Sequence, residues 1–347
     1  MPRKTFLIDG NWNLKRNHHR STALDAYGER CSGTYGFLIS LSTAVRKVLP
    51  NRVVCCWDGI KSGKLRYELY KPYKANRKKD WDIEECAIIE EGMNDPESKE
   101  RYEVLMQKIR AKNIIEDLYI RQIEADYIEG DDLIAQYCIM SEELGLEEEI
   151  IIFSRDKDYY QLISELVSVM NPDSIGLITK DNFKQKMGHT LENELMFKCF
   201  EGDTSDNIAG VKGVTRNTLI KFFPDIIDRK YTYKEIKHEC LELKKEKKYK
   251  KSKTLDKIIE AEEVLYRNAK LMNLKKPFIS KIAINDVTQM LNEPIDDDRS
   301  ISRAVLGMKK QGFLNMMEAE RINVDNFLSP FYRLKSQEAE YTKESNK

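Results

Sequence analysis

The chain has 347 residues and carries 58 basic and 58 acidic side chains, so its formal net charge is zero. This length can bury one large hydrophobic core or two moderate ones. A neutral total charge by itself indicates no particular partner. Seven cysteines without a Cys-x-x-Cys pair, and only four histidines, argue against a disulfide framework and against zinc chemistry. We expect a cytoplasmic protein with reduced thiols, no signal peptide and no membrane span.

Three short apolar runs, at residues 6–8, 53–57 and 150–153, lead directly into acidic residues. The acids that follow them are Asp9, Asp58, and the pair Asp156 and Asp158. Helical patterns lie between the runs, at residues 36–48 and 102–118. Strands that alternate with helices predict an α/β fold, with a mostly parallel central sheet and helices on both faces. Ligands bind beyond the carboxyl ends of such strands, so these acids are expected to share one site.

A cluster of acids, Glu129, Asp131 and Asp132, stands immediately before an apolar helical pattern. A helix N-cap and the helix dipole would account for one acid. They do not account for three, because adjacent carboxylates repel one another and resist ionisation. A divalent cation would compensate, and a ligand set of hard oxygens suits magnesium or manganese.

Residues 61–79 are strongly basic, and residues 80–100 are acidic. We interpret residues 71–113 as an excursion from the sheet with helical parts and a break near residues 92–96. A pair of charged helices that only face solvent is an alternative.

The pattern changes from residue 191 onward. A short helix at 194–200 is followed by Asp203 and Asp206, then by a Gly-x-x-Gly turn (Gly210 to Gly213, with Lys212), then by a helix at 215–223. Backbone N–H groups at such a turn suit a phosphate, although a plain helix connection is equally compatible. Residues 231–274 are lysine-rich and helical, and the polar tail beyond residue 335 is expected to be disordered.

Six segments together resemble the 5′-nuclease superfamily of flap endonucleases and 5′–3′ exonucleases. They are LIDG at 7–10, WDG at 57–59, YKANR at 73–77, EGDD at 129–132, SRDKDYYQL at 154–162 and GDTSDNI…GVKGV at 202–214. The likeness is greatest to the stand-alone bacteriophage enzymes and to the 5′-nuclease domain of bacterial DNA polymerase I. It implies a PIN/5′-nuclease-like catalytic domain over residues 1–193, with a helical arch at about 64–118. A helical DNA-binding region with a helix–hairpin–helix motif would follow at 194–335, and a disordered tail at 336–347.

The resemblance also implies two Mg²⁺ or Mn²⁺ ions. Five acids would surround the first ion and four would hold the second. The first set is Asp9, Asp58, Glu129, Asp131 and Asp132; the second is Asp156, Asp158, Asp203 and Asp206. Three cations would act on the scissile phosphate, namely Lys74, Arg77 and Arg16.

Further nucleic-acid contacts would come from Lys64, Arg66, Tyr73, Gly210, Lys212 and Gly213, and the hairpin would hold a K⁺ ion through carbonyl oxygens. Residues 215–217 depart from the usual glycine-containing run, which places that potassium site in question. Gly130 stands where alanine is commoner, a change too small to disturb ligation.

These features predict a metal-dependent, structure-selective 5′-nuclease that hydrolyses phosphodiesters by a two-metal mechanism in DNA replication or repair. Its substrates would be branched, nicked or flap DNA and RNA–DNA hybrids, including RNA primers. It would act as a monomer in a bacterial or phage-infected cytoplasm, with a single-strand-binding protein or a clamp as partner. The alternatives are a non-catalytic branched-DNA-binding protein on the same fold and a small RNA-cutting relative.

Overall fold

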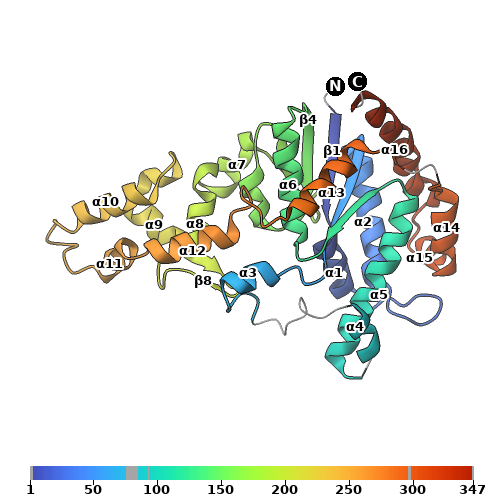
Figure 1. The fold of residues 1–347 in the computed structure, drawn as a ribbon, viewed down its shortest axis with the longest axis horizontal. Helices are drawn as coiled ribbons and strands as arrows, with labels where there is room; N and C mark the ends of the chain where they lie inside the picture. Colours follow the sequence, from blue (N-terminus) through green and yellow to red (C-terminus); the bar gives the residue numbers. More distant parts are fainter. Residues whose placement is uncertain (1–2, 76–84, 93, 296–297, 346–347) are drawn as a thin grey trace.

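The computed structural model describes residues 3–75, 85–92, 94–295 and 298–345. Its centre is a six-stranded sheet with the strand order β3-β2-β1-β4-β5-β6 (Figure 1). The strands are β1 (Arg3–Asp9), β2 (Arg52–Asp58), β3 (Arg121–Ala125), β4 (Glu148–Phe153), β5 (Val167–Asn171) and β6 (Gly176–Ile178). Neighbouring strands are parallel except for the antiparallel pair β5 and β6. The predicted mostly parallel sheet is therefore confirmed.

The central strands are apolar on both faces, as expected for a sheet that is covered by helices on both sides. Phe6, Leu7 and Ile8 of β1 are all fully buried. The register pairs Ile8 with Cys55 of β2 and with Phe153 of β4. The carboxyl ends of these three strands consequently lie at one edge of the sheet, where the acidic residues begin.

One face of the sheet is covered by α1 (Gly10–Arg20), α2 (Ser32–Val48), α5 (Pro96–Asp117) and the last three helices of the chain. These last helices are α14 (Ile301–Lys310), α15 (Phe313–Ala319) and α16 (Val324–Ser345). The other face is covered by α6 (Gly130–Glu143), α7 (Lys180–Met187) and α13 (Lys281–Asn292).

A second lobe extends from the sheet domain (Figure 1). It contains α8 (Glu194–Glu201), α9 (Arg216–Phe222), α10 (Tyr233–Leu243), α11 (Lys253–Ile259) and α12 (Glu262–Met272), which share one hydrophobic core. A two-stranded ribbon, β7 (Gly202–Asp203) with β8 (Ile208–Ala209), lies between α8 and α9. Short 3₁₀ helices at Lys157–Leu162, Leu191–Asn193 and Pro224–Ile227 join the larger elements.

The structure differs from the predicted division at residue 193. Helices α13 to α16 return to the sheet domain and pack in its two cores, so the hairpin lobe ends near residue 272. The tail that was expected to be disordered continues α16 as far as Ser345. Both differences arise because apolar residues of the last helices, such as Phe327 and Phe331, are buried against the sheet domain.

The segment predicted as a helical arch, at about 64–118, contains α3 (Lys64–Leu69), α4 (Glu85–Glu91) and α5, and residues 76–84 lie outside the described residues. Helix α5 begins at Pro96 because Asp95 caps it, accepting from the backbone N–H of Glu97 at 2.9 Å and of Ser98 at 3.1 Å. Within the described ranges, no helix is both long enough and apolar enough to cross a membrane.

Gly10 follows the first acid of the site and has no room for a side chain. An added Cβ would lie 2.6 Å from the ring of Trp57, which is fully buried and stacks on Phe37 at 5.7 Å. We predict that Gly10→Ala lowers the free energy of unfolding by about 1–3 kcal/mol through overpacking, measured by urea denaturation.

Gly307 provides the matched control, because an added Cβ within α14 would meet its nearest neighbour at an ordinary 3.7 Å. Gly307→Ala should leave stability unchanged or raise it by up to about 1 kcal/mol. Equal effects of the two substitutions would contradict the packing account.

Candidate metal centre

The strand ends bring Asp9, Asp58 and Asp156 to one edge of the sheet. Asp9 caps α1 by accepting from the N–H of Trp12 at 3.0 Å. Ser154 donates from its hydroxyl to Asp9 at 3.2 Å and accepts from the N–H of Asp156 at 3.1 Å, so it links the two acids. Burial, together with the neighbouring charges of Asp58 and Asp156, raises the pKa of Asp9 to about 7.

Asp58 is held in place by two donors. Its Oδ1 accepts from the N–H of Gly130 at 2.8 Å, and its Oδ2 accepts from the amide of Asn11 at 2.8 Å. Gly130 is the first residue of α6, so this bond places the acid cluster of residues 129–132 beside the end of β2.

The cluster Glu129, Asp131 and Asp132 converges in space, with ligand oxygens that all lie within 4.8 Å of one another. Glu129 is 4% exposed and Asp132 is 0% exposed. In the described part of the chain, Oδ1 of Asp131 is buried and accepts no hydrogen bond. Burial and the adjacent Asp132 raise the pKa of Asp131 well above its usual value. An unpartnered carboxylate oxygen of this kind fits a bound divalent cation.

Two cations of the chain already compensate the other members of the cluster. Arg66 donates to both oxygens of Asp132, at 2.6 and 2.8 Å, and also to Glu129. Lys74 donates to Glu129, and the hydroxyl of Tyr73 donates to it at 2.9 Å. Burial alone would raise the pKa of Glu129, but Lys74 and Arg66 outweigh it and lower that pKa to about 2.

This arrangement corrects two predicted nucleic-acid contacts. Arg66 is 5% exposed and Tyr73 is 2% exposed, so neither side chain is available to a substrate phosphate. The basic run around Arg66 suggested a surface role, whereas the side chain is an internal counter-ion for acids more than sixty positions away. Lys64, two positions earlier on α3, does remain partly exposed and lies 5.3 Å from the ring centre of Tyr127.

The remaining acids meet the cluster at a small internal cavity. Its volume is about 10 Å³, room for roughly one water-sized sphere. Four acids from three segments line it, namely Asp131, Asp158, Asp203 and Asp206. The structure thus brings these four acids together, and their role as metal ligands stays a prediction.

Lys198 on α8 is a site residue that the sequence analysis missed. Its ammonium pairs with Asp158 and lies 3.6 Å from a carboxylate oxygen of Asp203. Asp203 also accepts from the N–H and hydroxyl of Ser205, at 2.8 and 2.6 Å. Burial would raise the pKa of Asp203, but Ser205 and Lys198 lower it overall. A lysine five positions before Asp203, on the last turn of a helix that ends at the acids, was the available signal.

The acids open into a groove of about 990 Å³ that is lined by both acidic and basic residues. The acids are Asp156, Asp158, Glu194, Glu201 and Asp203, and the basic residues are Arg16, Arg155, Lys157, Lys198 and Arg216. The predicted catalytic residue Arg16 therefore faces the groove, where it pairs with Asp173 and lies 5.6 Å from the ring centre of Trp12. Arg77 lies outside the described residues.

Comparison with known proteins gives a consistent result. Residues 4–188 match the family described as 5′–3′ exonuclease, N-terminal resolvase-like domain. The 5′–3′ exonuclease of Bacillus subtilis (strain 168) is 31% identical over 237 residues, which cover 65% of this chain and 72% of that protein. The chain belongs to the 5′–3′ exonuclease family.

The chain is also similar to the thermostable DNA polymerase I of Thermus filiformis. It is 30% identical over 224 residues, and the chain spans 24% of that polymerase's length. Among solved structures, the bacteriophage T5 5′-exonuclease with bound divalent metal ions (zinc) has a TM-score of 0.57 at 17% identity, covering 90% of this chain and 99% of that one. The T5 D15 flap endonuclease in complex with DNA and metal ions has a TM-score of 0.55 at 17% identity, covering 91% and 100%. These two likenesses show the shared fold.

The Gly-x-x-Gly turn of this family member follows β8 directly. Before the turn, Gly202 of β7 has a φ of +75°, and an added Cβ there would lie 2.3 Å from the carbonyl oxygen of Ile208. Gly213 has a φ of +80°. Glycine is required at both positions because other residues rarely adopt this backbone region. Lys212 is exposed at the tip of the turn, where the predicted phosphate contact would lie.

The hairpin does not fit the potassium ion that the family resemblance implies. The carbonyl oxygen of Ala209 accepts from Arg267 at 2.6 Å and from Asn268 at 3.0 Å. The carbonyl oxygen of Lys212 accepts from the ammonium of Lys257 at 2.9 Å. Two positively charged groups thus bind two carbonyl oxygens of the hairpin, and they would repel a third positive charge there.

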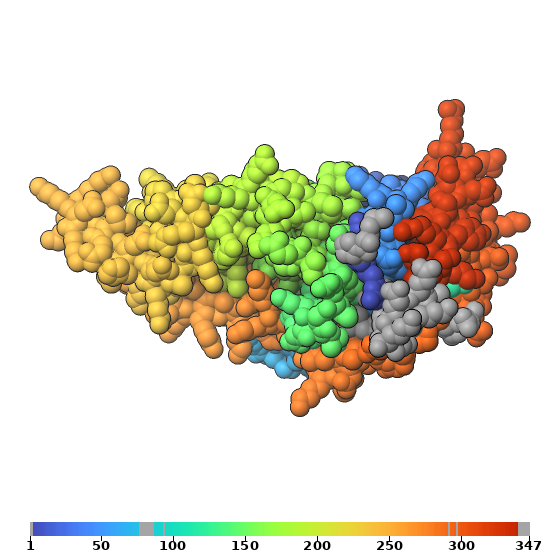
Figure 2. All heavy atoms as spheres, turned by 90° about the horizontal axis from the view of Figure 1, so that it is seen from above, coloured from blue at the N-terminus to red at the C-terminus, as the bar shows by residue number. Residues whose placement is uncertain are grey.

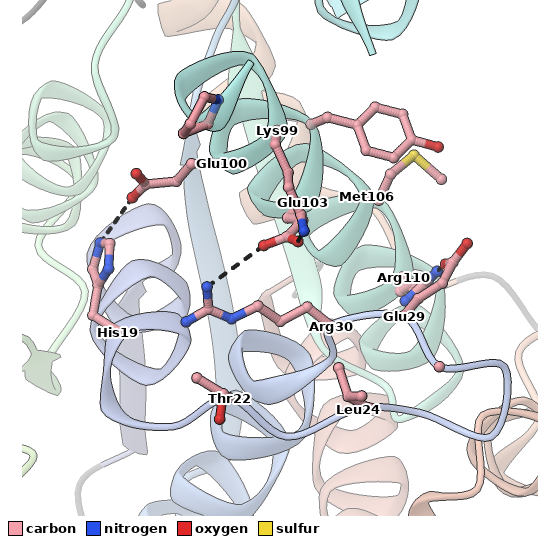
Figure 3. A pocket seen from close by; sticks show the side chains of 13 residues that line it. His19, Thr22, Leu24, Glu29, Arg30, Lys99, Glu100, Glu103, Met106 and Arg110 are labelled. Atoms are coloured by element: carbon pink, nitrogen blue, oxygen red, sulfur yellow. Dashed lines mark hydrogen bonds and ion pairs between the residues drawn. The ribbon is translucent and has the colours of Figure 1, made fainter. Parts of the chain in front are cut away.

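A second pocket, of about 590 Å³, lies between the end of α1, residues 22–30 and α5 (Figure 3). Its cations are paired with acids: Arg30 with Glu103 at 3.5 Å and Arg110 with Glu29. Figure 3 also shows His19 turned toward Glu100, at 3.8 Å.

His18, beside this pocket, forms a possible metal-binding group with His19 and Glu100. The N–H of Gly33 donates to Oε1 of Gln107 at 2.6 Å, which turns the amide NH₂ of Gln107 toward Nδ1 of His18 at 2.8 Å. Nδ1 is therefore an acceptor and Nε2 carries the proton, so the neutral imidazole has no free lone pair for a metal.

Arg66 can be tested as the internal counter-ion. We predict that Arg66→Leu lowers the free energy of unfolding by about 3–5 kcal/mol in EDTA, because Glu129 and Asp132 lose their buried cation. Millimolar Mn²⁺ should recover part of the loss, since a bound ion replaces the missing positive charge. Lys64→Leu on the same helix is the control and should change thermal stability little, and equal losses in the two variants would refute the assignment.

The hairpin makes a separate prediction about monovalent ions. Crystals of the wild-type protein soaked in Tl⁺, a potassium mimic, should show no anomalous peak at the carbonyl oxygens of residues 209–213. A doubly substituted protein, Lys257→Ala with Arg267→Ala, removes both positive charges from these oxygens and should gain a peak. A thallium peak at the wild-type hairpin would contradict this account of the carbonyl groups.

Proposed function

We propose that the chain is a metal-dependent, structure-selective 5′-nuclease that hydrolyses phosphodiester bonds with two Mg²⁺ or Mn²⁺ ions. The observation that carries the proposal is the convergence of four acids from three separate segments on one small cavity. The unpartnered oxygen of Asp131 and the open groove beside it add a place for a cation and a route for a substrate.

The acids would divide between the two ions by their position. Asp9, Asp58 and Asp131 would hold the first ion, and Asp156, Asp158, Asp203 and Asp206 the second. Glu129 and Asp132 form ion pairs with Lys74 and Arg66. They would act on the first ion through these cations or through water. Such an ion pair supplies an activated water and relief for the charge on the leaving oxygen. Because the ions activate the water, the site needs no imidazole base, in agreement with the small number of histidines in the chain.

The chain's own cations would offset the charge that the ions leave uncompensated. Lys74 lies at the cluster, Lys198 lies between Asp158 and Asp203, and Arg16 lies on the groove wall. A phosphate that approaches nine carboxylates would otherwise be repelled, and positively charged groups at the site stabilise charge in the transition state. Arg77, in the YKANR segment, would be a further cation that offsets this charge.

The substrates we propose are branched, nicked or flap DNA and RNA–DNA hybrids. Two observations support a nucleic acid: the arginines and lysines that line the groove beside the acids, and the glycine turn with exposed Lys212. The T5 D15 flap endonuclease, which shares the fold, has been solved in complex with DNA and metal ions. Contacts from lysine, arginine and backbone amides read the phosphate backbone, so recognition would depend on the shape of the substrate and not on its sequence.

The decisive test uses the acids of the second ion. Asp156→Asn and Asp203→Asn should each lower cleavage of an end-labelled flap substrate by at least about 100-fold, since loss of even a supporting metal contact costs this much. Binding of the same DNA in Ca²⁺, measured by fluorescence anisotropy, should remain within a few-fold of wild type. Asp181→Asn on α7, which removes an exposed acid, is the matched control.

Two outcomes would count against the proposal. Full cleavage activity of either site variant would show that the substituted acid does not hold a catalytic metal ion. Tight flap binding by the wild-type protein with no cleavage in Mg²⁺ or Mn²⁺ would favour a non-catalytic DNA-binding protein.

A further inference from the structure

A lysine-rich segment at the far end of the hairpin lobe is not used by the proposed chemistry. Residues 244–257 contain eight lysines and two acids, although the chain as a whole has no net charge. The segment joins α10 to α11 and includes most of α11. Figures 1 and 2 show this part of the chain at the narrow end of the molecule, away from the sheet.

The segment has a defined structure. The ring of Tyr249 packs edge-on against Phe222 of α9, with ring centres 5.9 Å apart. The N–H of Lys250 donates to the carbonyl oxygen of Glu246 at 3.1 Å, and the hydroxyl of Ser252 caps α11. The lysines are therefore carried by an ordered turn that is fixed to the helix after the glycine turn.

Most of the positive charge of this segment faces solvent. Lys244 pairs with Asp256, and Lys245 pairs with Glu242 at 2.6 Å. Among the residues that the structure describes, no acid forms an ion pair with Lys250 or Lys251, and both side chains are exposed. An unpaired cluster of this kind attracts a polyanion.

The lysine segment is continuous with the hairpin. Lys257, at its end, donates to the carbonyl oxygen of Lys212 at 2.9 Å and lies 3.7 Å from the position of a Cβ on Gly213. A nucleic-acid backbone that contacts the turn at residues 210–213 would therefore have the lysines next to it.

We propose that residues 244–253 form a second backbone-binding surface, which contacts the phosphates of duplex DNA beyond the glycine turn. Sites for unpaired strands present aromatic rings for base stacking. Here the one aromatic residue of the segment, Tyr249, packs on Phe222, which leaves lysines as the exposed groups. A rigid duplex, with one charge per ~1.7 Å of its axis, matches such a surface. This inference rests on the proposed function.

The test compares two variants that each remove two exposed lysines. Lys250→Gln/Lys251→Gln removes charge from the surface, and Lys309→Gln/Lys310→Gln removes it from α14 of the sheet domain. Binding to nicked duplexes in Ca²⁺ is measured by anisotropy across a salt series. One duplex has a short arm of about 6 base pairs on the hairpin side and the other a long arm of about 24, at ~3.4 Å per base pair.

On the long arm, the Lys250/Lys251 variant should bind about 10-fold or more weakly, and its salt slope should fall by about 2, one unit per phosphate contact. On the short arm it should match wild type, and the α14 variant should match wild type on both. Unchanged long-arm binding would overturn the inference. The same result is expected if the lysines bind an acidic protein and not duplex DNA. Equal losses on both arms would also overturn it.

The two proposals fail in different ways. If the wild-type protein binds neither duplex, the proposed function is at fault. If the wild-type protein binds both and the Lys250/Lys251 variant cannot be distinguished from it, only the second surface is at fault. Equal thermal midpoints of the variants and the wild type, from circular dichroism, show that the fold is retained.

Discussion

The mutual repulsion of carboxylates is the constraint on which the rest of this structure depends. Two unit charges 4 Å apart interact by about 4 kcal/mol at the effective dielectric of a protein surface, and a domain is stable by only about 5–15 kcal/mol. Nine acids at one edge of a sheet therefore need compensation before the fold can be stable. Burial, together with the repulsion of neighbouring carboxylates, raises the pKa values of Asp9 and Asp131.

The chain supplies part of the compensation from segments that the sheet does not contain. Arg66 comes from α3, at the start of the segment predicted as the arch, and Lys198 comes from the hairpin lobe. The base of the arch is also fixed to that lobe: Tyr73 lies in the lobe's core, and Asn207 donates to the carbonyl oxygen of Pro72 at 2.7 Å. The two lobes therefore meet through the acids and the cations that balance them. This link between the hairpin and the site would allow duplex binding to act on the position of Lys74.

The sheet and the clustering of acids could be predicted because both follow from local patterns. Apolar runs that end in Asp9 and Asp58 predict parallel strands, and parallel strands place their carboxyl ends at one edge. The place of Arg66 could not be predicted, because its partners are distant in sequence and its neighbours are basic. Lys198 had only a weak local signal, its place on the last turn of a short helix that ends at the acids, and this signal does not show which acids it pairs with.

The C-terminal half was less predictable for a different physical reason. Amphipathic helices show that one face is buried, but they do not show against what. Phe327 of α16 could equally have packed on the hairpin lobe, and only the tertiary structure places it against the sheet domain. The hairpin carbonyls show the same limit, because Lys257 and Arg267 reach them from helices that follow far along the chain.

The number of divalent ions that the site binds tests the central claim most directly. Titration of the wild-type protein with Mn²⁺, followed by electron paramagnetic resonance of the free ion and by calorimetry, should give two bound ions per chain. Asp131→Asn, which neutralises the carboxylate whose oxygen has no partner among the described residues, should weaken or abolish this uptake while the protein stays folded. Absence of Mn²⁺ and Mg²⁺ binding by the wild-type protein, or undiminished binding by the variant, would contradict the account.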